Sequence, residues 1–188
     1  MKLYLATKNK SKFQEAKTIL APFGIILEQA PDCEKIEPKE WPIEKVAAEN
    51  ARRLAHASKK PIIVDDSGCF FLAYNNFPGS QALWCFNGLG YTGLLKVLKG
   101  KDRSATFRCA AALCFPNEEP VVFLGEMKGR IAEKPAEGSN SEFPYDRIFI
   151  IDGFDKPVCL ISKEEKNKHS HRGNACRKLG AWVQSRGK

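Results

Sequence analysis

The stretch Pro61-Ile62-Ile63-Val64-Asp65-Asp66-Ser67-Gly68 decides the fold of this chain. Its run of β-branched apolar residues is typical of a strand buried on both faces in a mixed or parallel sheet. Two carboxylates follow at once, so we expect them at the end of the strand, where α/β sheets place their sites. Because neighbouring side chains of a strand point to opposite sides, only one of them would face a site. The same residues also suit a plain turn, with aspartate as a cap.

The flanking segments alternate between strand and helix patterns. Further strands are expected at residues 2–6, 25–29, 104–115, 121–128, 147–151 and 158–161. Residues 105–115 alternate between apolar and other positions, and residues 121–128 are expected to pair with this strand as a hairpin. Helices are expected after a capping box of Ser11 and Gln14, over residues 43–58, around residues 94–98, and at the end of the chain. The sequence therefore predicts an α/β fold with a mixed sheet and a single domain over residues 1–188.

Composition bounds the function classes. The chain has 188 residues, 43% of them hydrophobic, and a formal net charge of +8. The basic excess suits either a solvated surface or an anionic partner such as a nucleotide or nucleic acid. Seven cysteines without a C-x-x-C pair are typical of reduced thiols in a cytoplasmic protein. We expect no signal peptide and no membrane span.

Thr7-Lys8-Asn9-Lys10-Ser11-Lys12 joins the first strand to its helix. A helix N-terminus offers free N–H groups and the positive end of the helix dipole, and both favour phosphate. The glycines of a P-loop are missing, so this is a different kind of phosphate site or simply a solvated, capped turn.

Two later segments add cations and aromatic rings. Lys166 is followed by His171 and Arg172 near the start of the last helix, where Arg could hold phosphate as a fork and Lys as a point charge. The alternative is an exposed basic helix start. Phe143-Pro144-Tyr145-Asp146 could stack on a base and bond its edge, or could instead fill the core where a strand begins.

These four segments, in this order, resemble the inosine triphosphate pyrophosphatase family, which hydrolyses non-standard purine nucleoside triphosphates. The family pattern reads T-x-N-x-x-K, [DE]-D-S-G, F-x-Y-D-x-x-F and E-K-x-x-x-S-H-R, and the resemblance covers nearly the whole chain. It implies a long twisted mixed sheet flanked by helices, in two lobes with a substrate groove between them. It also implies hydrolysis of ITP, dITP and XTP to the monophosphate and pyrophosphate with Mg²⁺.

The resemblance also implies a role for each matching residue. Asp66 would bind the metal and act as the base for water, with Ser67 on the substrate. Glu40 would be the second metal ligand, with Glu37 as the alternative. The remaining substrate-binding residues would be Thr7, Lys8, Asn9, Lys10, Ser11, Lys12, Phe143, Pro144, Tyr145, Asp146, Lys166, His171 and Arg172.

The chain departs from the family at Pro144, where a glycine is usual, at Arg147, where a small residue or proline is usual, and at Leu54, where a lysine is often found. The first two bear on base selectivity. The implied partner is a purine nucleoside triphosphate, with no nucleic acid or membrane required, and relatives are commonly homodimers. The alternatives are a different metal-dependent nucleotide phosphatase and a basic nucleic-acid-binding module without catalysis.

Overall fold

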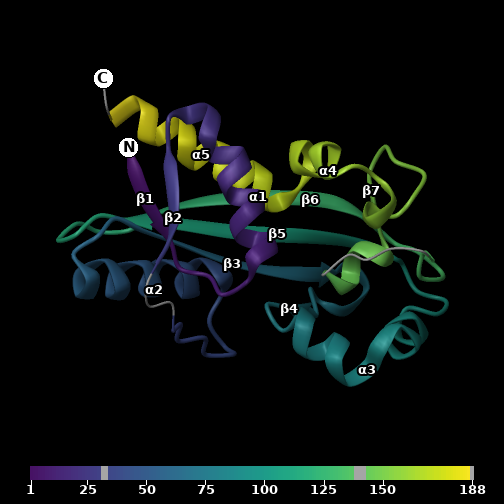
Figure 1. Cartoon of the computed structure of the whole chain (residues 1–188). Coiled ribbons are helices and arrows are strands. Elements are labelled where there is room, and N and C mark those ends of the chain that lie inside the picture. Colours follow the sequence, from purple (N-terminus) through teal and green to yellow (C-terminus); the bar gives the residue numbers. More distant parts are fainter. Residues whose placement is uncertain (31–33, 138–142, 187–188) are drawn as a thin grey trace.

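The computed structural model describes residues 1–30, 34–137 and 143–186. It has an α/β fold in which one mixed sheet carries helices on both faces (Figure 1). The strands are β1 Lys2–Leu5, β2 Ile26–Gln29, β3 Ile62–Phe71, β4 Pro78–Gly79, β5 Ser104–Cys114, β6 Val121–Ile131 and β7 Phe149–Ile151. The helices are α1 Lys10–Leu20, α2 Ile43–Ser58, α3 Ala82–Val97, α4 Lys163–His169 and α5 His171–Arg186.

The strand order is β2-β1-β3-β5-β6-β7, with β4 paired to β3. β1 runs parallel to both β2 and β3, whereas the pairs β3–β5, β5–β6 and β6–β7 are antiparallel. The predicted long mixed sheet and the predicted hairpin are therefore confirmed. Two lobes with a groove between them stay a prediction.

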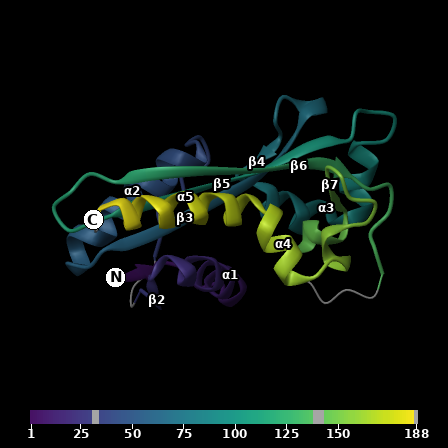
Figure 2. The same ribbon diagram turned by 90° about the horizontal axis from the view of Figure 1, so that it is seen from above.

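Alternate residues of β5 supply the cores on the two faces of the sheet. Ala111 packs in one apolar cluster with residues of α1 and α5, and Ala112 packs in another with residues of α2. A third cluster includes Phe71 and Ala105 at the far end of the sheet. Figure 2 shows α5 lying along the long sheet, with α1 beside it and α4 at its end.

Three expectations about elements are wrong. β3 does not end before the carboxylates but runs on to Phe71, because Cys69 and Phe71 continue its apolar face. Residues 158–161 hold the 3₁₀ helix Val158–Leu160 instead of a strand. The third helix begins well before residue 94, at Ala82.

The cysteines of the described ranges carry free thiols, and Cys33 lies outside those ranges. No helix in the ranges that the structure describes is long and apolar enough to cross a membrane.

Candidate functional site

The middle of β3 has an open edge. On that side β3 pairs with β1 at Ile62 and Ile63, and with β4 at Cys69 and Phe70. Within the described ranges, no strand pairs with residues 64–68 on this edge, although the opposite edge is paired with β5 throughout. The carboxylates thus lie beside the carboxyl end of β1, in the middle of their own strand. Sites in α/β sheets lie at the carboxyl ends of strands, and here the strand whose carboxyl end borders the carboxylates is β1 and not, as expected, β3.

The turn after β1 is held by its own side chains. Thr7 is buried, its hydroxyl accepts from the Asn9 N–H at 3.2 Å, and its carbonyl accepts from Gln29 Nε2 at 2.7 Å. Asn9 caps α1 by accepting from the Lys12 N–H at 2.9 Å. The expected cap at Ser11 is therefore wrong, because the helix already begins at Lys10. The fixed first turn gives the Lys12 side chain a defined direction.

Asp65 brings together two cations that are far apart in the sequence. Its Oδ2 lies 3.3 Å from Lys12 Nζ and accepts a hydrogen bond from Arg172 Nε at 3.0 Å. Burial alone would raise the pKa of Asp65, but Lys12, Arg172 and Lys35 outweigh it and hold the pKa well below its usual range. Asp65 is therefore ionised at every physiological pH, as the partner of two cations.

Asp66 lies in a different environment. It is partly exposed, and its carboxylate accepts a hydrogen bond from the backbone of Ser67. Burial raises the pKa of Asp66 to about 6, with Lys35 and Lys12 acting in the opposite direction. A carboxylate with this pKa is mostly ionised at neutral pH and is a better proton acceptor than an ordinary aspartate. We expected Asp66 to be the carboxylate that faces the cations, but the one that contacts both Lys12 and Arg172 is Asp65.

A loop lysine links the two aspartates. Lys35 Nζ donates to the backbone carbonyl of Asp65 at 3.3 Å and forms an ion pair with Glu37 at 3.1 Å. Glu37 in turn raises the pKa of Asp66, so the two carboxylates are close enough to repel. Glu37 and Glu40 are both exposed. Of the two candidate second metal ligands, Glu37 is the one that an ion pair with Lys35 holds near the aspartates.

The residues present fit a magnesium site whose remaining ligands come from water and the substrate. No group of three or more His, Cys, Asp or Glu side chains gathers within the described ranges. Mg²⁺ commonly binds through one or two carboxylates, with water and substrate phosphates as its other ligands. Asp66 and Glu37 are enough for such a site.

A second group of charges lies where α4 ends and α5 begins. Lys166 Nζ forms ion pairs with Asp146 at 2.8 Å and with Glu15 at 3.1 Å. Glu15 also accepts from Arg172 Nη1 at 2.5 Å. The Phe143 ring lies against both cations, 4.4 Å from Lys166 Nζ and 5.6 Å from Arg172 Cζ. The structure thus brings the predicted residues Phe143, Asp146, Lys166 and Arg172 together.

Other predicted residues do not join this cluster. Tyr145 is buried among the apolar residues, and its hydroxyl donates to the carbonyl of Ala82 at 2.9 Å, so the alternative reading as a core aromatic is correct for it. The carbonyl of Pro144 accepts from Tyr91 at 2.9 Å. Lys8 and Lys10 are exposed, and residues 138–142 of the preceding loop lie outside the described residues.

The departures at Arg147 and Leu54 have structural consequences. Arg147 packs on the Tyr91 ring at 5.3 Å and donates to the carbonyl of Ala136 at 2.8 Å, so it braces this loop. Leu54 is buried in the apolar cluster under α2, where it contributes no charge.

His171 is buried and neutral. Its ring lies 5.2 Å from the Phe107 ring, and burial together with Arg172 and Lys166 holds its pKa well below the usual range. Its Nδ1 has no hydrogen-bond partner within the described residues. Gly125 lets β6 pack closely against the start of α5. A Cβ at this position would collide with the carbonyl oxygen of His171.

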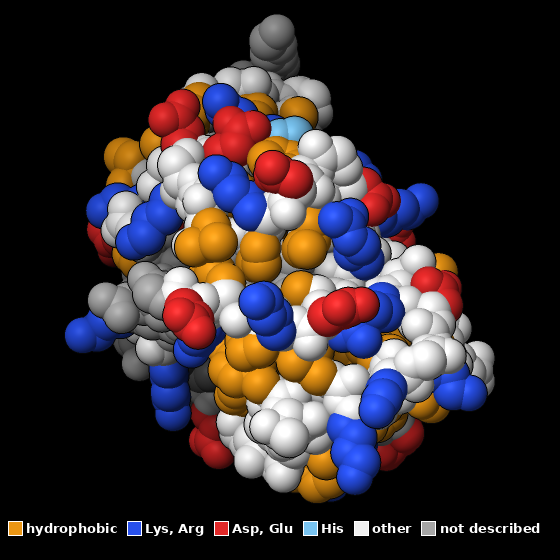
Figure 3. Space-filling view, turned by 90° about the vertical axis from the view of Figure 1, so that its right-hand side faces the viewer, with side chains coloured by type: hydrophobic (Ala, Val, Ile, Leu, Met, Phe, Trp, Pro, Cys, Tyr) orange, Lys and Arg blue, Asp and Glu red, His pale blue; other side chains and the backbone are white. Residues whose placement is uncertain are grey.

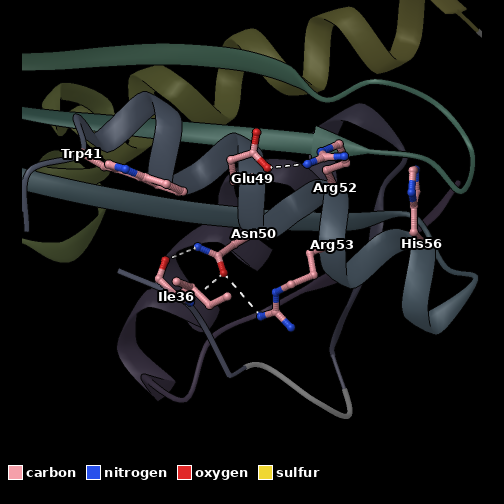
Figure 4. Close-up of a pocket in the computed structure, with 7 residues that line it drawn as sticks. All are labelled: Ile36, Trp41, Glu49, Asn50, Arg52, Arg53 and His56. Atoms are coloured by element: carbon pink, nitrogen blue, oxygen red, sulfur yellow. Dashed lines mark hydrogen bonds and ion pairs between the residues drawn. The ribbon is translucent and has the colours of Figure 1, made fainter. Parts of the chain in front are cut away.

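Two surface pockets lie away from these charges. One pocket of about 230 Å³ lies on the outer side of α2 (Figure 4). Its charged lining is already paired, since Arg52 contacts Glu49 at 2.6 Å and Arg53 donates to the carbonyl of Glu34. We therefore assign the site by its converging charges. Figure 3 shows charges of both signs mixed on one face, which suits a solvated surface there better than a nucleic-acid patch.

Three residues of the site were missed by sequence reasoning. Asp65 was seen but given no role, and Glu15 and Lys35 were not singled out. Glu15 lies one turn after Lys12 on α1, so the helical period could have placed both on one face. No local pattern marks Lys35, because its contact with Asp65 depends on the path of a loop.

Comparison with known proteins gives one consistent family. The Ham1 family model matches residues 3–182. A dITP/XTP pyrophosphatase of Methanopyrus kandleri is 40% identical over 98% of this chain and 97% of that protein. A dITP/XTP pyrophosphatase of Thermococcus kodakarensis is 36% identical over 98% of each.

Solved structures agree with the sequence matches. A HAM1 protein from Coxiella burnetii superposes with a TM-score of 0.81 at 28% identity, over 98% of this chain and 99% of that one. A nucleoside-triphosphatase / dITP/XTP pyrophosphatase from Mycobacterium abscessus gives a TM-score of 0.72 at 33% identity, over 97% and 99%.

Proposed function

This chain belongs to the Ham1 family, and from that premise we propose that it hydrolyses non-standard purine nucleoside triphosphates, among them dITP, XTP and ITP. The products would be the nucleoside monophosphate and pyrophosphate, so the enzyme would clear such nucleotides from the pool. The observation that carries the proposal is the meeting of Lys12 and Arg172 at Asp65 beside the open edge of β3.

The two ends of the cluster suit the two ends of a nucleotide. Lys12 and the N-terminus of α1 supply the positive charge that a triphosphate requires. Phe143 supplies an aromatic face for the base, and Arg172 supplies donors. A 6-oxo purine presents acceptors where adenine presents an amino group. Donors in a buried site would therefore favour hypoxanthine and xanthine, because an amino group facing them leaves polar groups unpaired.

We further propose that Asp66 and Glu37 hold a magnesium ion together with the substrate. Bound Mg²⁺ would neutralise phosphate charge and polarise the phosphoryl oxygens. The Glu37 side chain is 55% exposed, so its carboxylate can turn from Lys35 towards a cation beside Asp66.

Asp66 would also take the proton of the attacking water. The water oxygen forms a bond to phosphorus, the bond to the pyrophosphate leaving group breaks, and one proton passes to the carboxylate. In the metal-free protein the pKa of Asp66 is about 6, so this carboxylate is already mostly ionised near neutral pH and can accept a proton. Lys12, whose Nζ lies 3.3 Å from Asp65, would stay beside the phosphates throughout.

We propose a cytoplasmic enzyme that acts as a homodimer. The free thiols of the described cysteines support a cytoplasmic location. The family resemblance supports a homodimer, because members of that family are commonly homodimers.

A panel of triphosphates tests the proposal. We expect pyrophosphate release from dITP, XTP and ITP to exceed that from dATP and dGTP by at least about tenfold in kcat/KM. Release of orthophosphate would indicate a different phosphatase. An absence of turnover would indicate a binding module.

A further inference from the structure

Asp65 is shared by three elements that the sequence keeps far apart. It lies on β3, 107 residues from its partner Arg172 on α5, and it also contacts Lys12 on α1. The side chains of Asp65 and Arg172 are each only 4% exposed, and that of Lys12 is 20% exposed. A single carboxylate oxygen, Oδ2, serves both cations. Any change in one contact must therefore change the other.

A second carboxylate extends the connection. Glu15 binds Arg172 through one oxygen and Lys166 through the other, and Lys166 also binds Asp146. The contacts run without a break from the first turn of α1 to the aromatic loop. Charges in such a buried chain are strongly coupled, because little water screens them.

The other oxygen of Asp65 is unused. Oδ1 is buried and has no hydrogen-bond partner among the described residues. An unsatisfied buried carboxylate oxygen is costly, and such exceptions call for an explanation. Because Oδ1 holds no third partner, the Asp65 carboxylate can rotate between Lys12 and Arg172 without losing another contact.

We propose that Asp65 is a positioning residue that couples the grip of Lys12 on the phosphates to the reading of the base by Arg172. The inference rests on the proposed function, because that function gives Lys12 and Arg172 their roles. When phosphate draws Lys12 away, Asp65 keeps its hydrogen bond with Arg172. Asp65 then holds the guanidinium by Nε and Glu15 holds it by Nη1, so that Nη2 would be directed at the base.

Reciprocity makes the coupling measurable without turnover. If phosphate binding prepares Arg172, it must raise the affinity for a base, and base binding must raise the affinity for phosphate by the same factor. The probes are inosine, which has no phosphate, and inorganic tripolyphosphate, which has no base. Titration calorimetry in chelator gives the affinity for inosine with and without saturating tripolyphosphate.

We expect tripolyphosphate to tighten inosine binding to the natural protein by at least about fivefold, the lower end of typical coupling. In Asp65→Asn the factor should fall to about one, because the amide cannot hold two cations. The matched control is Glu49→Gln, a carboxylate-to-amide change on α2 at a residue that pairs with Arg52, which should keep the coupling. A natural protein without coupling, or an Asp65→Asn variant with the full factor, overturns the inference.

Two further measurements separate the possible failures. Melting curves show whether Asp65→Asn folds. If it does not, Arg172→Lys provides the same test, because a lysine has no planar guanidinium with which to contact both Asp65 and Glu15. Full coupling in Arg172→Lys would equally overturn the inference. Pyrophosphate release from dITP by the natural protein is measured in parallel. Turnover without coupling refutes only the role of Asp65, whereas an absence of turnover refutes the proposed function itself.

Discussion

Asp65 and Asp66 are neighbours on β3, yet their environments shift their acidities in opposite directions. The pKa of Asp65 is held well below its usual range by Lys12, Arg172 and Lys35, and burial raises the pKa of Asp66 to about 6. Strand alternation points the two side chains to opposite faces. One carboxylate is thus a permanent anion and the other can take up a proton near neutral pH, and such divergent pKa values are typical of divided roles in an active site.

The first prediction concerns Asp66→Asn. Loss of the proton acceptor should lower kcat at least about 100-fold, because general-base catalysis contributes 10²–10⁴-fold. The fold should be retained, as shown by circular dichroism. Glu49→Gln on α2 is a matched surface control, since Glu49 pairs only with Arg52 among the recorded partners. Near-normal turnover by Asp66→Asn would remove Asp66 from the chemistry.

The same substitution should stabilise the metal-free protein at neutral pH. The folded pKa of Asp66 is raised from 3.8 to about 6, so the stability it confers is full below pH 4 and is lost as the pH rises through 6. The loss corresponds to roughly 3 kcal/mol at most. Urea unfolding in chelator should therefore find Asp66→Asn more stable at pH 7 and equal at pH 4. A less stable variant at pH 7 would contradict the raised pKa.

Activity should depend on pH in the same range. The logarithm of kcat/KM for dITP should rise with a slope of one up to a pH near 6 and then level, because the free enzyme needs Asp66 ionised. The buried His171 is already neutral there and adds no second step. A profile that is flat between pH 5 and 7 would show that Asp66 does not limit the reaction.

Arg172 should govern the choice of base. Arg172→Ala removes the donors and should narrow the ratio of kcat/KM between ITP and ATP about tenfold or more. Arg172→Ala also leaves Asp65 and Glu15 without a shared cationic partner. Arg172→Lys keeps the positive charge, so it should fold better and is measured as a second variant. An unchanged ratio in both variants would exclude Arg172 from base reading.

The metal requirement separates Glu37 from Glu40. Chelation should stop turnover and added Mg²⁺ should restore it. Glu37→Gln should raise the Mg²⁺ concentration for half-maximal rate on the order of tenfold, as expected from losing one charge beside a dication. Glu40→Gln, the same change on an exposed residue, should not. The opposite ranking would restore Glu40 as the ligand.

Local patterns predicted most of the fold. The α2 helix was predicted with its observed bounds, Ile43–Ser58, because its apolar residues recur at helical spacing. The hairpin of β5 and β6 was predicted because Ala105 to Leu113 alternate. The strand predicted at residues 158–161 was wrong, because a short apolar run does not distinguish a strand from a 3₁₀ turn that fills the core.

The site was harder to predict than the fold. The order of the motifs located Lys12, Asp146, Lys166 and Arg172, which do meet in the structure. The partners Glu15 and Lys35 depend on how α1 and a loop pack against β3, and no local spacing encodes that packing. The same holds for Asp65, whose role follows from the open edge of the sheet.

Phosphorus NMR of dITP incubated with Mg²⁺ and the natural protein, beside Asp66→Asn, tests the central claim most directly. The account predicts that the natural protein converts dITP to equal amounts of dIMP and pyrophosphate, and that Asp66→Asn leaves dITP intact over the same time. The appearance of dIDP with orthophosphate, or equal conversion by the two proteins, would contradict it.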